Sequence, residues 1–144
     1  MRPHEAAVAV TALALWVAGC ARPAGPPTIA LGTPCVACGM AVQDLRFACA
    51  REVDERWRVY DSIECLLRDI GVGPSAGVYL ADYDRQTLHA ADSLWVVRGE
   101  FASPMGGGFA AFLDLAAADS IAAATRGRVD RLAAFKAASG EAGR

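Results

Sequence analysis

The sequence predicts the same order of elements, strand, strand, helix, strand, twice in succession after Pro34, and this repeat limits the chain to few folds. In the first set, short strands are expected at 46–51 and 57–60, on either side of a charged turn. A helix follows, because apolar residues recur there at helical spacing. These residues are Ile63, Leu66, Leu67 and Ile70. A third strand at 77–81 closes the set.

The second set begins after Asp82-Tyr83-Asp84, which we interpret as a solvated turn. Strands are expected within 88–97 and 108–113, followed by an alanine-rich helix over 115–125. The segment 129–135 fits either a strand or a helix. The repeat therefore predicts an α+β fold of two small, duplicated ββαβ modules.

Capping residues mark the ends of both helices. Asp61 and Ser62 precede the first helix, and Asp114 precedes the second. The residues expected to end the helices are Gly71, Gly73 and Gly127. We therefore interpret Asp61 as a helix cap rather than an acid–base group. Since no nucleophile–base pair is evident either, we expect no enzymatic activity.

The N-terminal segment resembles an export signal. Residues 6–18 form an almost uninterrupted apolar run, shorter than the roughly 20 residues that span a bilayer. The run leads into Val17-Ala18-Gly19-Cys20, which resembles a bacterial lipobox. We expect a lipoprotein signal peptide over 1–19 and a protein anchored through lipidated Cys20 on the periplasmic or extracytoplasmic face of a bacterial membrane. A plain secreted protein or an uncleaved anchor helix is the alternative.

The remaining chain divides into a tether and two modules. Residues 20–34 are rich in proline and glycine and carry little charge, which is typical of an extended tether. We expect a first module at 35–83, a second at 84–138 and a tail at 139–144. The formal net charge of −2 provides no basic surplus to attract nucleic acid.

Cys35-Val36-Ala37-Cys38-Gly39-Met40 places two thiols and a thioether within one short segment. Such soft ligands select Cu(I), zinc or an iron–sulfur cluster over hard cations, and the methionine favours Cu(I). In an oxidising compartment the same two thiols can also pair as a disulfide. The segment therefore predicts either a dithiol metal site or a local disulfide, and both states remain open.

The other titratable sulfur and imidazole groups have simpler interpretations. Cys49 and Cys65 lie among apolar residues and are typical of small buried side chains, although a disulfide between them remains open. His89 lies in a strand-like segment and is favoured as a partly exposed strand histidine over a ligand.

The motifs taken together resemble those of the NosL family. They are the lipobox, Cys35-x-x-Cys38-Gly39-Met40, Tyr60-Asp61-Ser62 opening a helix with Cys65, and Ser103-Pro104-Met105-Gly106-Gly107-Gly108-Phe109-Ala110-Ala111-Phe112. NosL proteins are lipoprotein copper chaperones associated with maturation of nitrous oxide reductase. The resemblance covers about residues 20–135. It implies two ββαβ modules related to organomercurial lyase.

The resemblance also implies Cu(I) as the bound ion, held by Cys38 or Cys35, Met40 and Met105. Met105 follows a proline on a glycine-rich turn, where a thioether can point at a metal, although it could also fill a gap in the core. Some relatives carry a histidine where this chain has Gly107. This departure favours an all-sulfur site and leaves His89 as the one imidazole of the processed chain.

Three functions follow, in order of preference. The first is a Cu(I) chaperone that delivers copper to an exported enzyme, nitrous oxide reductase or its assembly complex. The second is a thiol–disulfide redox lipoprotein using Cys35 and Cys38, which would benefit from a helix N-terminus at the first thiol. The third is a zinc-stabilised, lipid-anchored binding module, for which the sequence lacks an evident set of four ligands.

Overall fold

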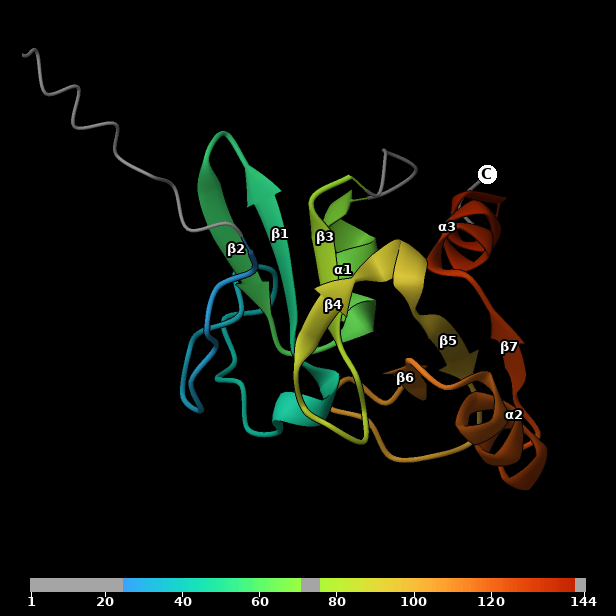
Figure 1. Cartoon of the computed structure of the whole chain (residues 1–144). Helices are drawn as coiled ribbons and strands as arrows, with labels where there is room; N and C mark the ends of the chain where they lie inside the picture. The colour runs from blue at the N-terminus through green and yellow to red at the C-terminus, as the bar shows by residue number, and fades with distance from the viewer. Residues whose placement is uncertain (1–24, 71–75, 142–144) are drawn as a thin grey trace, which may run out of the picture.

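A computed structural model describes residues 25–70 and 76–141, with side chains described as far as Lys136. The predicted signal peptide (1–19), Cys20, and Gly71 and Gly73 lie outside the described residues. Within the described part the chain forms two antiparallel sheets and the helices that pack on them (Figure 1).

The first sheet contains four strands in the order β2-β1-β3-β4. They are β1 (Cys49–Val53), β2 (Arg56–Tyr60), β3 (Val78–Ala81) and β4 (Leu88–Ala90). The β1–β2 hairpin turns at Asp54 and Glu55, which both have positive φ, as a type I′ turn requires. Helix α1 (Ile63–Ile70) connects β2 to β3, and its apolar side chains pack with Cys49, Tyr60 and Leu80 of the sheet.

The second sheet contains three strands in the order β6-β5-β7. They are β5 (Trp95–Arg98), β6 (Phe109–Phe112) and β7 (Arg128–Asp130). Helix α2 (Leu115–Ala124) connects β6 to β7 and begins at Asp114, whose side chain accepts a hydrogen bond from the backbone N–H of Ala116. In both sheets the first strand of the module lies between the second and the third. The duplicated ββαβ fold is therefore confirmed.

The segment 88–97, expected to carry one strand, forms two strands in different sheets. Its first part, β4, pairs with β3 in the first sheet, and β5 belongs to the second sheet. Between them a 3-10 turn, η2 (Ala91–Ser93), redirects the chain. Ala91, the first residue of this turn, and Leu94, which follows it, are both buried, so the crossing is fixed by core packing rather than by a polar loop.

Two other boundaries also differ in detail from the expectation. The strand expected from residue 46 begins at Cys49, because 45–47 form a 3-10 turn, η1 (Leu45–Phe47), capped by Asp44. The segment 129–135, which fitted either a strand or a helix, contains part of both. Strand β7 ends at Asp130, and helix α3 (Leu132–Glu141) follows after one residue.

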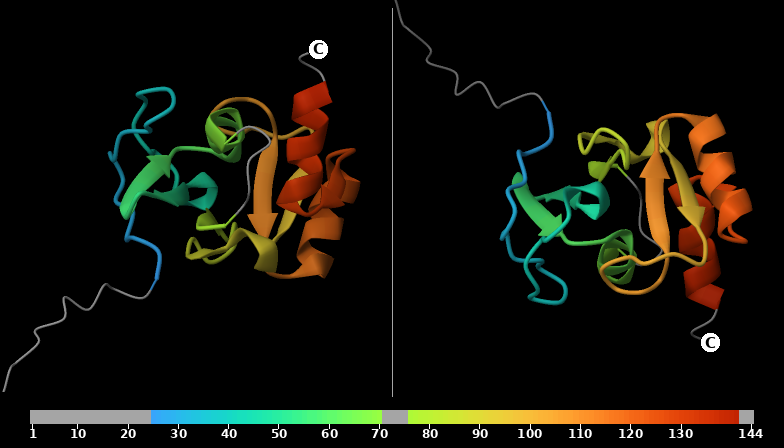
Figure 2. Two further views of the ribbon diagram at one scale, coloured as in Figure 1. Left: turned by 90° about the horizontal axis from the view of Figure 1, so that it is seen from above. Right: turned by 90° about the horizontal axis from the view of Figure 1, so that it is seen from below.

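The two modules share one core. Leu66 and Leu80 of the first module pack in the same cluster as Val96 and Phe109 of the second. Alternate residues of the second sheet, such as Val97 and Phe112, pack instead with α2. The first module and α2 therefore lie on opposite sides of the second sheet (Figure 2), which explains why all four residues of β6 are buried.

Asp82 joins the modules and is buried, in contrast to the solvated turn expected from the sequence. Its Oδ1 accepts a hydrogen bond from the backbone N–H of Leu113, at 2.8 Å, and its Oδ2 accepts one from the N–H of Arg85. The next residue, Tyr83, donates its backbone N–H to the carbonyl of Ala111. These contacts attach the end of β3 to β6 and hold the two sheets together.

Candidate metal centre

Side chains from two separate segments meet at one point: Cys35 and Cys38 from one, and Asp61 and Cys65 from the other. One ligand atom from each, a thiol sulfur or a carboxylate oxygen, lies within 4.8 Å of the others. Cys35, Asp61 and Cys65 are buried, whereas Cys38 is half-buried. Three thiols and a carboxylate are donors that suit a soft or borderline cation. The structure therefore contains a group that could hold a metal ion.

The loop that carries Cys35 and Cys38 is a tight hairpin. Pro34 and Ala41 form an antiparallel bridge, and inside it the Cys35 N–H donates to the Met40 carbonyl at 2.8 Å. Gly39 donates its N–H to the Cys35 carbonyl and has a φ of 78°, a conformation that glycine adopts readily. The N–H of Val36 donates to Val59 of β2, so the hairpin is fixed to the edge of the first sheet.

Asp61 and Cys65 come from the start of α1. The helix is capped by Ser62, whose Oγ accepts a hydrogen bond from the Cys65 N–H at 3.2 Å. The interpretation of Asp61 as a cap was therefore wrong. Its Oδ1 instead accepts a hydrogen bond from the Cys38 thiol, with a sulfur–oxygen distance of 3.7 Å.

Cys65 is buried, as expected, but its sulfur belongs to the cluster rather than only to the core. Sequence reasoning missed this role and that of Asp61. The available signal was their spacing, since residues four apart in a helix start lie on the same side of the chain. Cys65 could have been proposed as a third thiol ligand, because it follows Asp61 by one helical turn in a chain that also has a Cys-x-x-Cys segment.

Burial favours the protonated form of Cys35 and Cys65. It raises the pKa of Cys35, although the backbone N–H groups of Asp61, Cys38 and Ala37 act in the opposite direction. It also raises the pKa of Cys65 to about 12, with a smaller opposing effect from Arg68, whose Nη2 lies 3.1 Å from the sulfur. Without a cation, these two groups are therefore thiols at neutral pH, and binding a metal releases protons.

A cavity of about 370 Å³ lies beside the cluster. Asp61 forms part of its wall, together with Met40 of the hairpin and with Ser103 and Pro104 of the second module. Asp61 is thus the cluster residue that faces the cavity, whose walls come from both modules.

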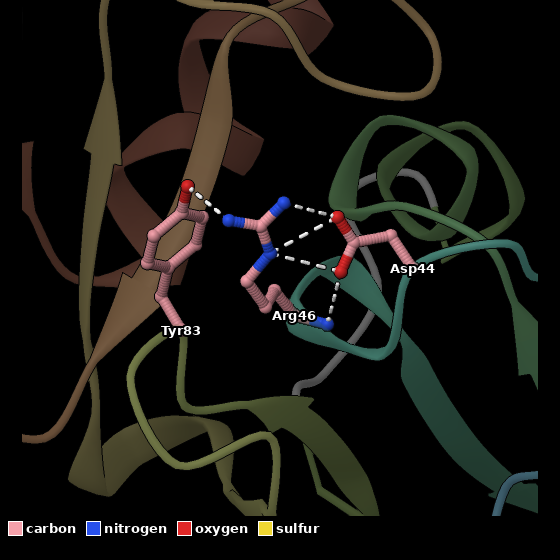
Figure 3. Close-up of polar contacts among 3 residues, drawn as sticks. All are labelled: Asp44, Arg46 and Tyr83. Atoms are coloured by element: carbon pink, nitrogen blue, oxygen red, sulfur yellow. Dashed lines mark hydrogen bonds and ion pairs between the residues drawn. The ribbon is translucent and has the colours of Figure 1, made fainter.

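Arg46 and Asp44 also line this cavity, and their charges compensate each other. The Nε of Arg46 donates to both carboxylate oxygens of Asp44 at 3.0 Å, and its Nη1 donates to the Tyr83 hydroxyl (Figure 3). This hydrogen bonding lowers the pKa of Asp44. The guanidinium also lies 4.9 Å from the centre of the Tyr83 ring. This part of the wall is therefore ordered and close to neutral.

The two methionines implied as ligands lie outside the core. Met40 lines the cavity and is 46% exposed, and Met105 is 36% exposed on the turn that follows Pro104. Since Met105 is exposed, the alternative that it fills a core gap is wrong. The structure thus brings Cys35 and Cys38 together, places Met40 on the adjoining cavity and leaves Met105 on a surface turn.

The remaining candidates, His89 and Cys49, are not members of the cluster. His89 is on β4, where its Nε2 is 2.9 Å from the Thr87 hydroxyl, in keeping with a partly exposed strand histidine. Cys49 is buried, its thiol donates to the Phe47 carbonyl, and burial raises its pKa. Cys49 and Cys65 are both free thiols, so the disulfide left open between them is not formed.

The fold and the site define a small protein of two ββαβ modules with a thiol-rich centre that could hold a metal ion. Among solved structures, the crystal structure of the copper chaperone NosL from Shewanella denitrificans is similar. The two chains superpose with a TM-score of 0.63 at 16% identity, over 76% of this chain and 94% of that chain. At this identity the likeness shows a shared fold, and the NosL-like fold implied by the motifs is confirmed.

Sequence comparisons add no family assignment, because no family profile and no curated protein matches the chain. In residues 25–70 and 76–141, none of the helices has the length and apolar character needed to cross a bilayer.

Proposed function

We propose that this protein binds Cu(I) at the thiol cluster and transfers it to an exported copper enzyme, nitrous oxide reductase or the complex that assembles it. The observation that carries the proposal is the convergence of Cys35, Cys38 and Cys65 at one point. Thiolates are preferred ligands of Cu(I). A fold shared with a copper chaperone supports the same class of function. The protein then acts as a carrier rather than an enzyme.

The accessibility of the cluster suits a carrier. Cys38 is half-buried, and the cavity beside Asp61 leaves one side open, where a ligand from a partner can approach the ion. Sites that are structural are usually closed by four protein ligands, whereas sites that exchange a ligand keep an open position. Met40 on the cavity wall supplies a thioether on that open side.

The zinc-stabilised module remains a second candidate, because the structure adds donors that the sequence did not reveal. Cys65 and Asp61 complete a set of four with Cys35 and Cys38, and such a set also suits zinc. The redox candidate is disfavoured, because burial raises the pKa of Cys35, whereas an attacking thiol needs a lowered one.

The contribution of Met105 separates copper from zinc. Met105→Ala is expected to weaken Cu(I) binding by about 10- to 100-fold, the range seen when groups that tune a metal site are removed. It is expected to leave zinc binding unchanged, because thioethers add little to a zinc site. Competition titrations with both ions measure this, with Leu31→Ala as the control because Leu31 is also an exposed apolar residue. An unchanged Cu(I) affinity would remove Met105 from the site.

We also propose that the protein is anchored to the membrane through acylated Cys20. Each buried methylene of an acyl chain contributes about 0.8 kcal/mol, and several chains make a stable anchor. Cys20→Ala is therefore expected to release or misprocess the protein in a fractionation of bacterial cells. Cys49→Ala, which removes a cysteine elsewhere and keeps the lipobox, is expected to stay with the membranes. Normal processing and membrane partition of Cys20→Ala would exclude lipid anchoring.

A further inference from the structure

We infer that Glu64 is a positioning residue that fixes the turn carrying Met105 to α1, the helix that carries Cys65. The inference rests on the proposed function, in which Met105 is a copper ligand. Glu64 lies in the first turn of α1, directly before Cys65. It reaches from the helix that carries part of the cluster to the loop of the other module that carries Met105.

The Glu64 carboxylate binds both ends of this loop. Its Oε1 accepts a hydrogen bond from the Ser103 hydroxyl at 2.7 Å and another from the Gly107 N–H at 2.9 Å. Ser103 Oγ in turn accepts from the N–H of Gly108 at 3.0 Å. Since Met105 lies between the two anchors, its backbone is fixed relative to α1.

The loop itself is a tight turn inside these anchors. The Gly106 N–H donates to the Ser103 carbonyl at 3.0 Å, which places Met105 at the tip of a four-residue turn. Met105 is 36% exposed and is not part of the buried core. The hydrogen bonds at the base of the turn therefore fix the backbone position from which its side chain extends.

Gly107 makes room for the carboxylate. A Cβ at this position would lie 2.6 Å from Cγ of Glu64 and 2.8 Å from its Oε1. Both atoms belong to a flexible side chain, so any other residue at 107 would displace Glu64 rather than the backbone. The contact between Glu64 and the turn therefore requires glycine at position 107. Gly107→Ala is a second substitution that is expected to break this contact.

Stability alone does not explain this carboxylate. Its second oxygen, Oε2, is buried without a hydrogen-bond partner among the described residues. A buried polar atom without a partner costs free energy, which an apolar contact at this point would avoid. The role of this carboxylate is therefore to fix the position of the loop, through the two hydrogen bonds that Oε1 accepts.

The methyl resonance of Met105 tests the positioning directly. In the reduced full-length chain with labelled methionine methyl groups, Glu64→Ala and Gly107→Ala are expected to shift and sharpen the Met105 signal and to leave that of Met40 unchanged. Glu64→Gln is expected to retain the wild-type signal, because its amide oxygen can accept both hydrogen bonds. Glu100→Ala, which removes an exposed carboxylate paired with Arg126, is the control.

Cu(I) affinity supplies the second measurement. Glu64→Ala is expected to lose the same factor in affinity as Met105→Ala, and the double variant is expected to lose no more than either alone. A Met105 signal unchanged in both Glu64→Ala and Gly107→Ala would overturn the inference, as would additive losses in the double variant. If the signal moves but Met105→Ala binds Cu(I) normally, the positioning by Glu64 is upheld. The assignment of Met105 as a copper ligand is then wrong.

Discussion

Cys38→Ser is expected to lower the Cu(I) affinity of the reduced protein by more than about a hundredfold, since even the loss of groups behind the ligands costs 10- to 100-fold at metal sites. Cys35→Ser is expected to cost less. Cys38 is the half-buried thiol of the hairpin, lies beside Gly39 and Met40, and is hydrogen-bonded to Asp61. A thiolate there can share one ion with Met40 on the open side of the site.

Cys35 has a different environment. It is buried, and its sulfur is near the backbone N–H groups of Asp61, Cys38 and Ala37. Cys35 is therefore the inner thiol of the Cys35/Cys38 pair. Anaerobic competition titrations on both single variants measure the difference. Cys49→Ser is the matched control, because Cys49 is a buried free thiol outside the cluster. Equal losses for Cys35→Ser and Cys38→Ser would contradict the assignment of Cys38 as the principal thiolate.

The largest effect on stability is expected from Gly108→Ala. Gly108 has a φ of 69°, and a Cβ there would lie 1.8 Å from the carbonyl oxygen of Gly99. The left-handed conformation costs about 1–2 kcal/mol and the forced movement of packed groups about 1–3 kcal/mol more. We therefore expect the free energy of unfolding to fall by about 3 kcal/mol or more, because the obstacle is backbone and cannot rotate away.

Gly106→Ala is the matched control for this substitution. Gly106 has a similar φ of 73°, but a Cβ at this position would meet nothing within 4 Å. Only the conformational cost remains, about 1–2 kcal/mol. Urea unfolding of both variants measures the difference. Equal destabilisation would mean that the nearby Gly99 carbonyl does not restrict position 108.

Local patterns in the sequence were sufficient for most of the fold. Asp114 begins α2 as expected, and the apolar spacing of 63–70 predicted α1. The passage of the chain from one sheet to the other at 91–93 could not be predicted, because β4 and β5 are both short extended segments. Their pairing partners distinguish them, because β4 pairs with β3, which precedes it, and β5 pairs with β6 and β7, which follow it.

In the candidate site, too, local sequence patterns predicted some residues, and the others depend on contacts between separate segments. Cys35 and Cys38 were evident because a single hairpin carries both. Asp61 and Cys65 join them only because Val36 fixes that hairpin to β2, next to the start of α1. Asp61 was also misinterpreted, because Asp and Ser are equally good caps and Ser62 takes that role here.

The most direct test of the central claim is an anaerobic titration of the reduced full-length protein with Cu(I) in the presence of excess zinc. The thiol cluster and its thioether neighbours predict that one Cu(I) binds per chain and that zinc does not displace it. Retention of zinc at the cluster, with Cu(I) excluded, would contradict the account and would favour the zinc-stabilised binding module instead.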